Sequence, residues 1–252
     1  MPDPRTIELI RNDLGAGVVE VVLNRAPVNA LTAPFLMAFA AVLDDLARDH
    51  EVRAVVLSSG FKVFSAGLDL KEAQDVDRAA ENGIVDGLNT GFLTQFAFPK
   101  PLVAAVTGSA IAGGLFFVLA ADWRVSASGA KFGLAEVRVG ADFPIGPLEI
   151  ARATLGPNTL RRLMLTGQPV PAPVAAAEGI VDHICAAADV REAAIAKARE
   201  LAVIPGATYA RVKAQVRGPA ISVIETGMEN LRNDPDRRWF GPETKAAMRN
   251  ML

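Results

Sequence analysis

The sequence is poor in cysteine, histidine and tyrosine, and these shortages exclude several kinds of site. Its 252 residues include one cysteine, two histidines and one tyrosine. The single cysteine, Cys185, has no partner for an intrachain disulfide, and its apolar neighbours indicate a buried, unreactive thiol. The histidines, His50 and His183, match no metal-ligand spacing, so we expect neither a metal site nor a catalytic histidine.

The sequence also lacks an excess of charge of one sign and a long apolar run. The formal net charge is −2, with basic and acidic residues mixed, which argues against a nucleic-acid partner. The longest apolar stretch, residues 110–121, is shorter than the roughly 20 residues that cross a bilayer. The opening residues, MPDPRTIELI, carry proline and aspartate where a signal peptide has basic and apolar segments. We therefore expect a cytoplasmic protein with no membrane partner.

Hydrophobic residues make up 51% of the chain, and short strand patterns alternate with helical ones over its first part. This alternation predicts an α/β fold in which helices cover layered sheets. Strands are expected at residues 5–10, 18–23, 52–58, 102–106, 123–127, 131–133 and 180–184. Thr32 is a good N-cap for an amphipathic helix that ends near Asp49. Gly83, Gly87 and Gly91 weaken any single helix across residues 72–98, so two helical pieces are expected there.

From residue 189 onward the pattern is entirely helical. Helices are expected at residues 189–203, 206–217, 219–232 and 242–251. These helices are too few to bury their own apolar faces, so they should pack on the core or on a neighbouring subunit. The predicted organisation is a core over residues 1–190 that holds the functional site, followed by a helical region over residues 191–252.

The stretch GSAIAGGLFFVLAAD, residues 108–122, joins a turn of small residues directly to a buried helix. The first N–H groups of a helix lack intrahelical partners, and the helix dipole adds partial positive charge there. Glycines allow a ligand to approach that backbone closely. The stretch is therefore either a donor site for a bound or developing anion, or a turn that only lets a core helix pack closely.

Three segments then occur in a specific order: FSAGLDLKE (64–72), SAIAGGLFF (109–117) and KFGLAE (131–136). Together with KPLVAAVTG (100–108) and AAAEGIVD (175–182), they resemble the crotonase, or enoyl-CoA hydratase/isomerase, superfamily over nearly the whole chain. The resemblance implies a spiral of ββα units with a helical C-terminal region, assembled as trimers or dimers of trimers. It also implies acyl-CoA thioester substrates, with coenzyme A as part of the substrate and no separate cofactor.

In that family, two backbone N–H groups hold the thioester oxygen in an oxyanion hole. Carried over by position, the two donors would be those of Leu68 and Gly113. The neighbouring residues that would line the substrate site are Ala66, Gly67, Asp69 and Leu70. Lys71 would be either a further contact to coenzyme A or a solvated surface lysine.

The sequence departs from the hydratase branch at one of that branch's two water-binding glutamates. Glu136 stands at one of the two positions, but Phe116 occupies the other, and a phenyl ring cannot orient or deprotonate water. A single carboxylate can instead move a proton from C2 to C4 of a 3-enoyl thioester. With PVNAL (27–31) and Pro144, this pattern resembles the Δ3,Δ2-enoyl-CoA isomerases, in which Phe116 and Pro144 would help to keep the pocket dry.

Two other readings remain open. If Asp142 points into the pocket, it would supply a second acid for hydratase or other crotonase chemistry; otherwise it is an exposed or helix-capping aspartate. The chain would alternatively be an acyl-CoA-binding protein without activity. Trp239 and Phe240 would close the pocket of the same or a neighbouring subunit, or only pack there.

Overall fold

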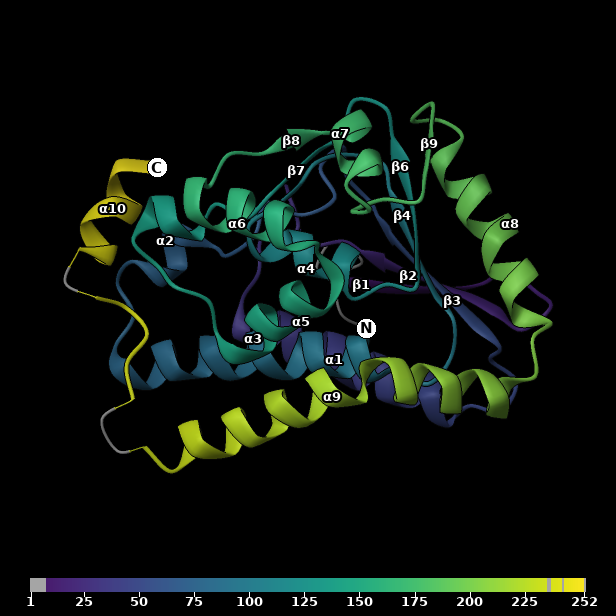
Figure 1. The fold of residues 1–252 in the computed structure, drawn as a ribbon, viewed down its shortest axis with the longest axis horizontal. Helices are drawn as coiled ribbons and strands as arrows, with labels where there is room; N and C mark the ends of the chain where they lie inside the picture. Colours follow the sequence, from purple (N-terminus) through teal and green to yellow (C-terminus); the bar gives the residue numbers. More distant parts are fainter. Residues whose placement is uncertain (1–7, 235–236, 242, 252) are drawn as a thin grey trace, which may run out of the picture.

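The computed structural model describes residues 8–234, 237–241 and 243–251, and it is built around a six-stranded sheet (Figure 1). The strand order is β1-β2-β3-β4-β6-β9. The first two strands form an antiparallel hairpin, and each later neighbour pairs in parallel. The strands are β1 (Leu9–Asp13), β2 (Val18–Leu23), β3 (Ala54–Ser59), β4 (Leu102–Val106), β6 (Trp123–Ala127) and β9 (His183–Cys185). The expected α/β class is confirmed, and β2, β3, β4 and β6 lie where strands were expected. β1 extends to Asp13, beyond the expected end at residue 10, and β9 begins at His183 rather than at residue 180. Residues 1–7, at the start of the first expected strand, lie outside the described residues.

A smaller three-stranded sheet, in the order β5-β7-β8, lies beside the main one. Its strands are β5 (Ala110–Ile111), β7 (Lys131–Gly133) and β8 (Val170–Pro171). The short β5 comes immediately before the glycine turn, and β7 immediately precedes the segment that carries Glu136. The small sheet therefore places the two predicted catalytic segments next to each other.

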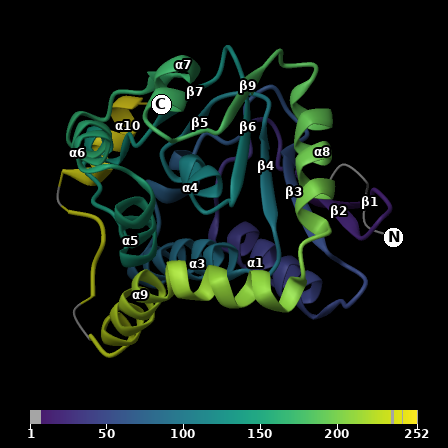
Figure 2. The ribbon, with the colours of Figure 1, turned by 45° about the vertical axis from the view of Figure 1, so that its right-hand side comes forward.

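Helices cover both faces of the main sheet (Figure 2). Helix α8 (Val190–Ala202) packs along one face, and α4 (Gly113–Leu119) lies on the other. The remaining described helices are α1 (Ala33–Arg48), α2 (Leu70–Ala73), α3 (Arg78–Ala97), the 3-10 turn η2 (Glu136–Val139), α5 (Ile145–Thr154), α6 (Pro157–Thr166), α7 (Ala172–Ala177), α9 (Gly206–Arg232) and α10 (Thr244–Met251). No helix within the described ranges is both long enough and apolar enough to cross a bilayer.

Helix α1 begins and ends as its sequence predicts. The Thr32 side chain accepts a hydrogen bond from the Phe35 amide at 3.3 Å, and Asp49 is the C-cap. Phe35, Phe39 and Leu43 recur at helical spacing and are fully buried. The cap and the apolar stripe are local signals, so the sequence alone was sufficient to place this helix.

Helix α3 differs from the prediction, because it runs unbroken through Gly83, Gly87 and Gly91. Two helices were expected between residues 72 and 98. A short helix, α2, does precede α3, but α3 itself is not divided. A Cβ on Gly87 would come within 3.0 Å of the Ala33 Cα, and one on Gly91 within 3.2 Å of the Leu36 side chain. These two glycines let α3 approach α1 closely, and this packing offsets their low helix propensity.

Helix α9 also differs, because it continues through Pro219, where the sequence predicted a break. A proline inside a helix costs about 3 kcal/mol, since it removes a backbone donor and crowds the preceding turn. Arg217 compensates by donating to the carbonyls of Phe96 and Ala120 at 2.8 and 3.0 Å. The helix also packs on α3 and α5, so it covers the core of the same chain.

Candidate active site

A pocket of about 130 Å³ opens where α4, η2 and the turn before α2 meet. Its lining is almost wholly apolar, and Glu136 is the sole ionisable side chain among the described residues that form it. The lining residues are Ala66, Leu68, Leu70, Leu88, Ile111, Ala112, Gly113, Phe116, Ala135, Glu136, Val139, Ala141, Phe143, Pro144, Pro147, Trp239 and Met248. A single carboxyl group therefore carries the ionisable chemistry of this cavity.

Two backbone turns meet at one side of the pocket. Gly67 has a φ of +84°, and a Cβ there would come within 2.8 Å of the Ala112 Cβ and 3.1 Å of the Gly113 amide nitrogen. The Leu68 amide donates to no other described residue, and the Gly113 amide, as the first of α4, has no intrahelical acceptor. The backbone bonds here are made by the Asp69 and Ala112 amides, which donate to the Leu31 and Gly133 carbonyls. Two amide donors are thus available beside an apolar cavity, as an oxyanion hole requires.

Strand β5 fixes the second of these turns. The Ile111 amide donates to the Ser65 carbonyl at 3.0 Å, and the Ala112 amide donates to the Gly133 carbonyl at 2.7 Å. Ala112 itself has a φ of +49°, a strained conformation for a residue with a side chain. The strained residue lies where the chain turns from β5 into α4. The next amide, that of Gly113, is unpaired among the described residues at this turn.

Glu136 begins η2 at the opposite side of the pocket and is only 9% exposed. Burial raises the pKa of Glu136 to about 8, while a hydrogen bond to its backbone acts in the opposite direction. Its Oε2 atom has no hydrogen-bond partner among the residues that the structure describes. A desolvated carboxyl with a free oxygen is typical of a group that exchanges protons with a ligand.

Phe116 lies one turn into α4 and is fully buried in the pocket wall. Its ring packs 5.5 Å from that of Phe92 and meets the ring of Phe143 nearly edge-on, with the centroids 6.3 Å apart. Pro144 lines the pocket next to Phe143. These side chains offer no donor or acceptor to water on that side.

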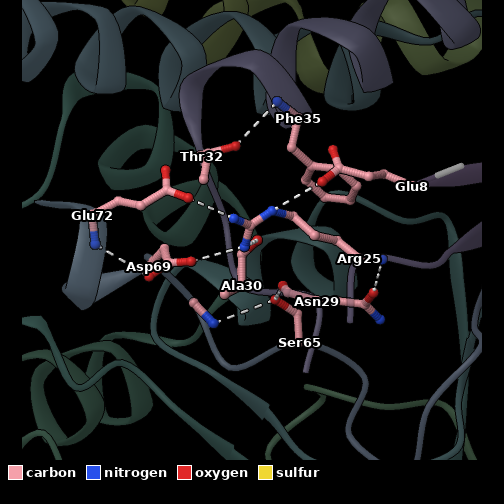
Figure 3. Close-up of polar contacts among 10 residues, drawn as sticks. Glu8, Arg25, Asn29, Ala30, Thr32, Phe35, Ser65, Asp69 and Glu72 are labelled. Atoms are coloured by element: carbon pink, nitrogen blue, oxygen red, sulfur yellow. Dashed lines mark hydrogen bonds and ion pairs between the residues drawn. The ribbon is translucent and has the colours of Figure 1, made fainter. Parts of the chain in front are cut away.

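Asp69 lies outside the set of described residues that line the pocket, and it holds the first turn in place (Figure 3). Its carboxylate caps α2 and accepts a hydrogen bond from Arg25 at 2.9 Å. Arg25 also pairs with Glu72 at 2.8 Å. The aspartate therefore supports the backbone of Leu68 and Leu70 from behind. Lys71 is exposed on α2.

Sequence reasoning missed the part that Arg25 and Asn29 play in this support. Asn29 is fully buried; its side chain donates to the Phe64 carbonyl at 2.9 Å, and its own carbonyl accepts from the Ser65 hydroxyl at 2.7 Å. Its φ of +49° is a turn conformation that asparagine tolerates well. An asparagine between apolar residues in PVNAL was the available signal, but two of its partners, Phe64 and Ser65, lie 35 and 36 positions away.

Asp142 is exposed, and its side chain is not part of the described pocket lining. Its carbonyl accepts a hydrogen bond from the indole N–H of Trp239 at 3.2 Å. Asp142 therefore supports the position of Trp239 through its backbone, whereas Glu136 contributes a side chain to the pocket. Within the described ranges, no group of three or more histidine, cysteine, aspartate or glutamate side chains could hold a metal ion.

The closing segment, residues 237–241 and 243–251, brings Trp239 and Met248 to the pocket of its own chain. The buried carboxylate of Glu81 on α3 accepts hydrogen bonds from the amides of Trp239 and Phe240, the latter at 2.8 Å. Arg237 pairs with Asp86 on the same helix at 2.8 Å. The sequence left open whether Trp239 and Phe240 serve the same or a neighbouring subunit, and here Trp239 lines the pocket in cis while Phe240 is buried beside it.

Comparisons with known proteins agree with this geometry. Residues 13–232 match the family model described as enoyl-CoA hydratase/isomerase. A probable enoyl-CoA hydratase, EchA17, from Mycobacterium tuberculosis is 38% identical over 210 residues, 80% of this chain and 77% of that protein. The human mitochondrial enoyl-CoA hydratase domain-containing protein 2 is 35% identical over 232 residues, covering 88% and 80% of the two chains.

Among solved structures, the human mitochondrial Δ3-Δ2-enoyl-CoA isomerase superposes with a TM-score of 0.88 at 26% identity. The superposition covers 97% of this chain and 96% of that one. The predicted crotonase fold is therefore confirmed over both the ββα core and the C-terminal helices. Sequence, fold and pocket lead to the same conclusion: this chain belongs to the enoyl-CoA hydratase/isomerase family.

Proposed function

We propose that this protein is a Δ3,Δ2-enoyl-CoA isomerase in which Glu136 alone moves the proton. The observation that carries the proposal is that Glu136 is the sole ionisable side chain among the described residues around an apolar pocket. Adding water across a double bond needs a positioned water and a group that activates it. Moving the double bond needs only one base that reaches two carbons. The structural similarity to the human isomerase supports this choice.

The proposed reaction balances without any cofactor. Glu136 takes a proton from C2 of a 3-enoyl thioester, and the C2–H electron pair moves into a dienolate. The Leu68 and Gly113 amides donate to the thioester oxygen, where negative charge develops, and such donors act most strongly in a dry site. The protonated Glu136 then returns the proton to C4, which leaves the double bond between C2 and C3 in the 2-trans product.

The raised pKa of Glu136 suits both halves of this cycle. A carboxyl group with a pKa of about 8 is a stronger base than an ordinary glutamate, and it still gives up its proton readily. The apolar lining that raises the pKa also keeps water away from the dienolate.

A hydratase is the second candidate, because the relatives EchA17 and the human domain-containing protein 2 are named hydratases. In this chain, hydratase chemistry would require a second polar group in addition to Glu136. Asp142, in the loop after Glu136, is the candidate for that group, and its exposed position outside the pocket lining favours the isomerase.

A paired assay of the purified protein tests the choice. One sample receives a 3-enoyl-CoA and the other a 2-enoyl-CoA, and the absorbance of the conjugated thioester is followed in both. The isomerase predicts a rise in the first sample and no change in the second. A fall in the second sample would mean hydration, and Asp142→Asn would then show whether that aspartate supplies the missing group.

Glu136→Gln distinguishes an enzyme from a protein that only binds acyl-CoA. The variant keeps the size of the side chain but loses the base, so turnover should fall by about 10²–10⁴-fold while thioester binding persists. Unchanged turnover would contradict the assignment of the base. A parent protein that binds acyl-CoA but converts neither substrate would support the non-catalytic alternative.

We further propose that the active form is a trimer or a dimer of trimers, as the family resemblance implies, and that it works in the cytoplasm. Light scattering of the purified protein measures the assembly. Fractionation of its native cells measures the location.

A further inference from the structure

A second hollow of about 320 Å³ lies directly behind one wall of the active-site pocket. The two cavities share three lining residues, Phe143, Pro144 and Trp239. One part of the second hollow is lined by apolar side chains of α3, α5 and α9: Val85, Ile145, Leu148 and Leu231. Its polar lining residues are Asn82, Asp142, Arg237 and Arg238. The shared residues are therefore a partition between the catalytic pocket and a larger, partly apolar space.

The volume of the catalytic pocket limits what fits in front of that partition. A dry cavity of about 150 Å³ holds one benzene molecule, a group of six carbon atoms. At about 130 Å³, the pocket accommodates an acyl group of similar or slightly smaller size. A longer tail needs more room than this cavity offers.

The aromatic side chains trace the direction in which such a tail would run. Gly113 provides a donor for the thioester oxygen, and Phe116 follows one turn later on the same helix. The Phe116 ring meets that of Phe143, which belongs to the partition. An acyl chain that starts at the donors and follows the apolar face of Phe116 therefore reaches the partition.

Trp239 is the largest of the three shared residues, and it is held from several sides. Its amide donates to the buried Glu81 carboxylate, and its indole N–H donates to the Asp142 carbonyl at 3.2 Å. Its ring stacks on Phe240 with centroids 4.8 Å apart. The indole is thus fixed across the path between the two cavities.

We propose that Trp239 sets the upper limit of acyl-chain length, because its indole separates the catalytic pocket from the apolar part of the hollow, which would receive a longer tail. This inference rests on the proposed acyl-CoA site and adds the substrate class, which is short-chain acyl thioesters of about six carbons or fewer. Removing the indole joins the two spaces, and medium-length tails then extend into the hollow between α3, α5 and α9.

The test measures the dissociation constants of saturated acyl-CoAs of four to twelve carbons by calorimetry, together with turnover of 3-enoyl-CoAs of six and ten carbons. Each methylene buried in an apolar site tightens binding about fourfold. For the parent protein, binding should tighten up to about six carbons and then level off. In Trp239→Ala the tightening should continue to about ten carbons, and the ratio of kcat/KM for the ten-carbon over the six-carbon substrate should rise at least tenfold.

Trp123→Ala is the matched control, because Trp123 is the other tryptophan of the sequence and packs under Lys197 at the start of β6. It should keep the parent's length profile. Phe143→Ala opens the same partition from a loop far from Trp239 in sequence, so it tests the inference if Trp239→Ala folds poorly.

Two outcomes would overturn the inference alone. The first is that the length profiles of Trp239→Ala and Phe143→Ala both match that of the parent. The second is that binding to the parent already tightens steadily up to twelve carbons. Continued isomerisation in either case leaves the proposed function standing. Failure of the parent to bind any acyl-CoA would instead overturn the proposed function, and this inference with it.

Discussion

Gly67 lies so close to Gly113 that a Cβ on the first would come within 3.1 Å of the amide nitrogen of the second. These residues are far apart in the sequence, and their contact places the Leu68 and Gly113 amides at one side of the pocket. The proposed oxyanion hole therefore depends on the absence of a side chain at position 67.

Gly67→Ala should abolish most of the activity. The new methyl group would meet the Ala112 Cβ at 2.8 Å and the Ile111 carbonyl at 2.9 Å, so the two turns must separate. Loss of one oxyanion donor lowers kcat by about 10²–10³-fold, and we expect a loss of this size in steady-state kinetics. Gly179→Ala is the control: Gly179 has a similar φ of +73° but open space around it, so it shares the backbone strain without the clash. Equal activity of the two variants would rule out this account of the site.

The pH profile of catalysis should reflect the raised pKa of Glu136. The base must be ionised in the free enzyme, and its pKa is about 8. With a 3-enoyl-CoA substrate, kcat/KM should therefore rise about tenfold per pH unit below 8 and level off above it. A profile that is flat from pH 6 to 9 would show that Glu136 titrates normally or is not the base.

The same group should make the parent protein less stable at high pH. Its pKa is raised from 4.5 in the unfolded chain to about 8 in the folded one, so between these values the folded state binds more protons. The stabilisation is complete below about pH 4.5 and is lost as the pH rises through 8, with a slope of at most about 1.4 kcal/mol per pH unit. Urea unfolding of the parent and of Glu136→Gln, compared from pH 5 to 9, isolates this contribution.

Glu136→Gln should become more stable relative to the parent as the pH rises from 5 to 9, because glutamine has no proton to lose. Other titrating groups are present in both proteins, and their contributions cancel in the difference. A difference that does not change with pH would contradict the burial of an ionisable carboxyl at this position.

Asp122 should be essential for stability although it lies outside the pocket lining. Its carboxylate pairs with Lys213 at 2.7 Å and with Arg217 at 2.8 Å, and all three side chains are largely buried. Asp122→Ala leaves two buried cations without their partner, which typically costs 3–5 kcal/mol of unfolding free energy, and urea denaturation measures the loss. Asp45→Ala removes an exposed pair with Arg48 and should change stability by less than about 1 kcal/mol. A loss from Asp122→Ala as small as that of the control would show that the buried cluster is not stabilising.

Features with local signals could be predicted from the sequence. The α1 boundaries follow from the Thr32 cap and the periodic phenylalanines, and the glycine turn before α4 predicted free amides beside an apolar helix. The placement of Glu136 in the pocket followed from family resemblance, because nothing local in KFGLAE tells which way its glutamate points. Its role in catalysis stays a prediction.

The features that the sequence missed depend on contacts between distant residues. Pro219 and Gly87 are helix-breaking or helix-weakening by themselves, and the continuity of α9 and α3 becomes understandable only from what packs against them. The ion pair of Asp69 with Arg25, 44 positions earlier, likewise has no local signal. Glu81 gave no signal at all, since its partners are backbone amides on another segment.

Because Glu81 holds the closing segment from α3, local detachment of this segment differs from unfolding of the whole domain. The amides of Trp239 and Phe240 donate to the Glu81 carboxylate on α3, Arg237 pairs with Asp86 on the same helix, and Phe240 packs at the edge of the core. None of these contacts is made with a strand of either sheet. Detaching this segment would therefore cost less free energy than complete unfolding, because both sheets would stay paired. Under the proposed function, the contacts of this segment would govern access to the pocket, whereas the paired strands govern the stability of the fold.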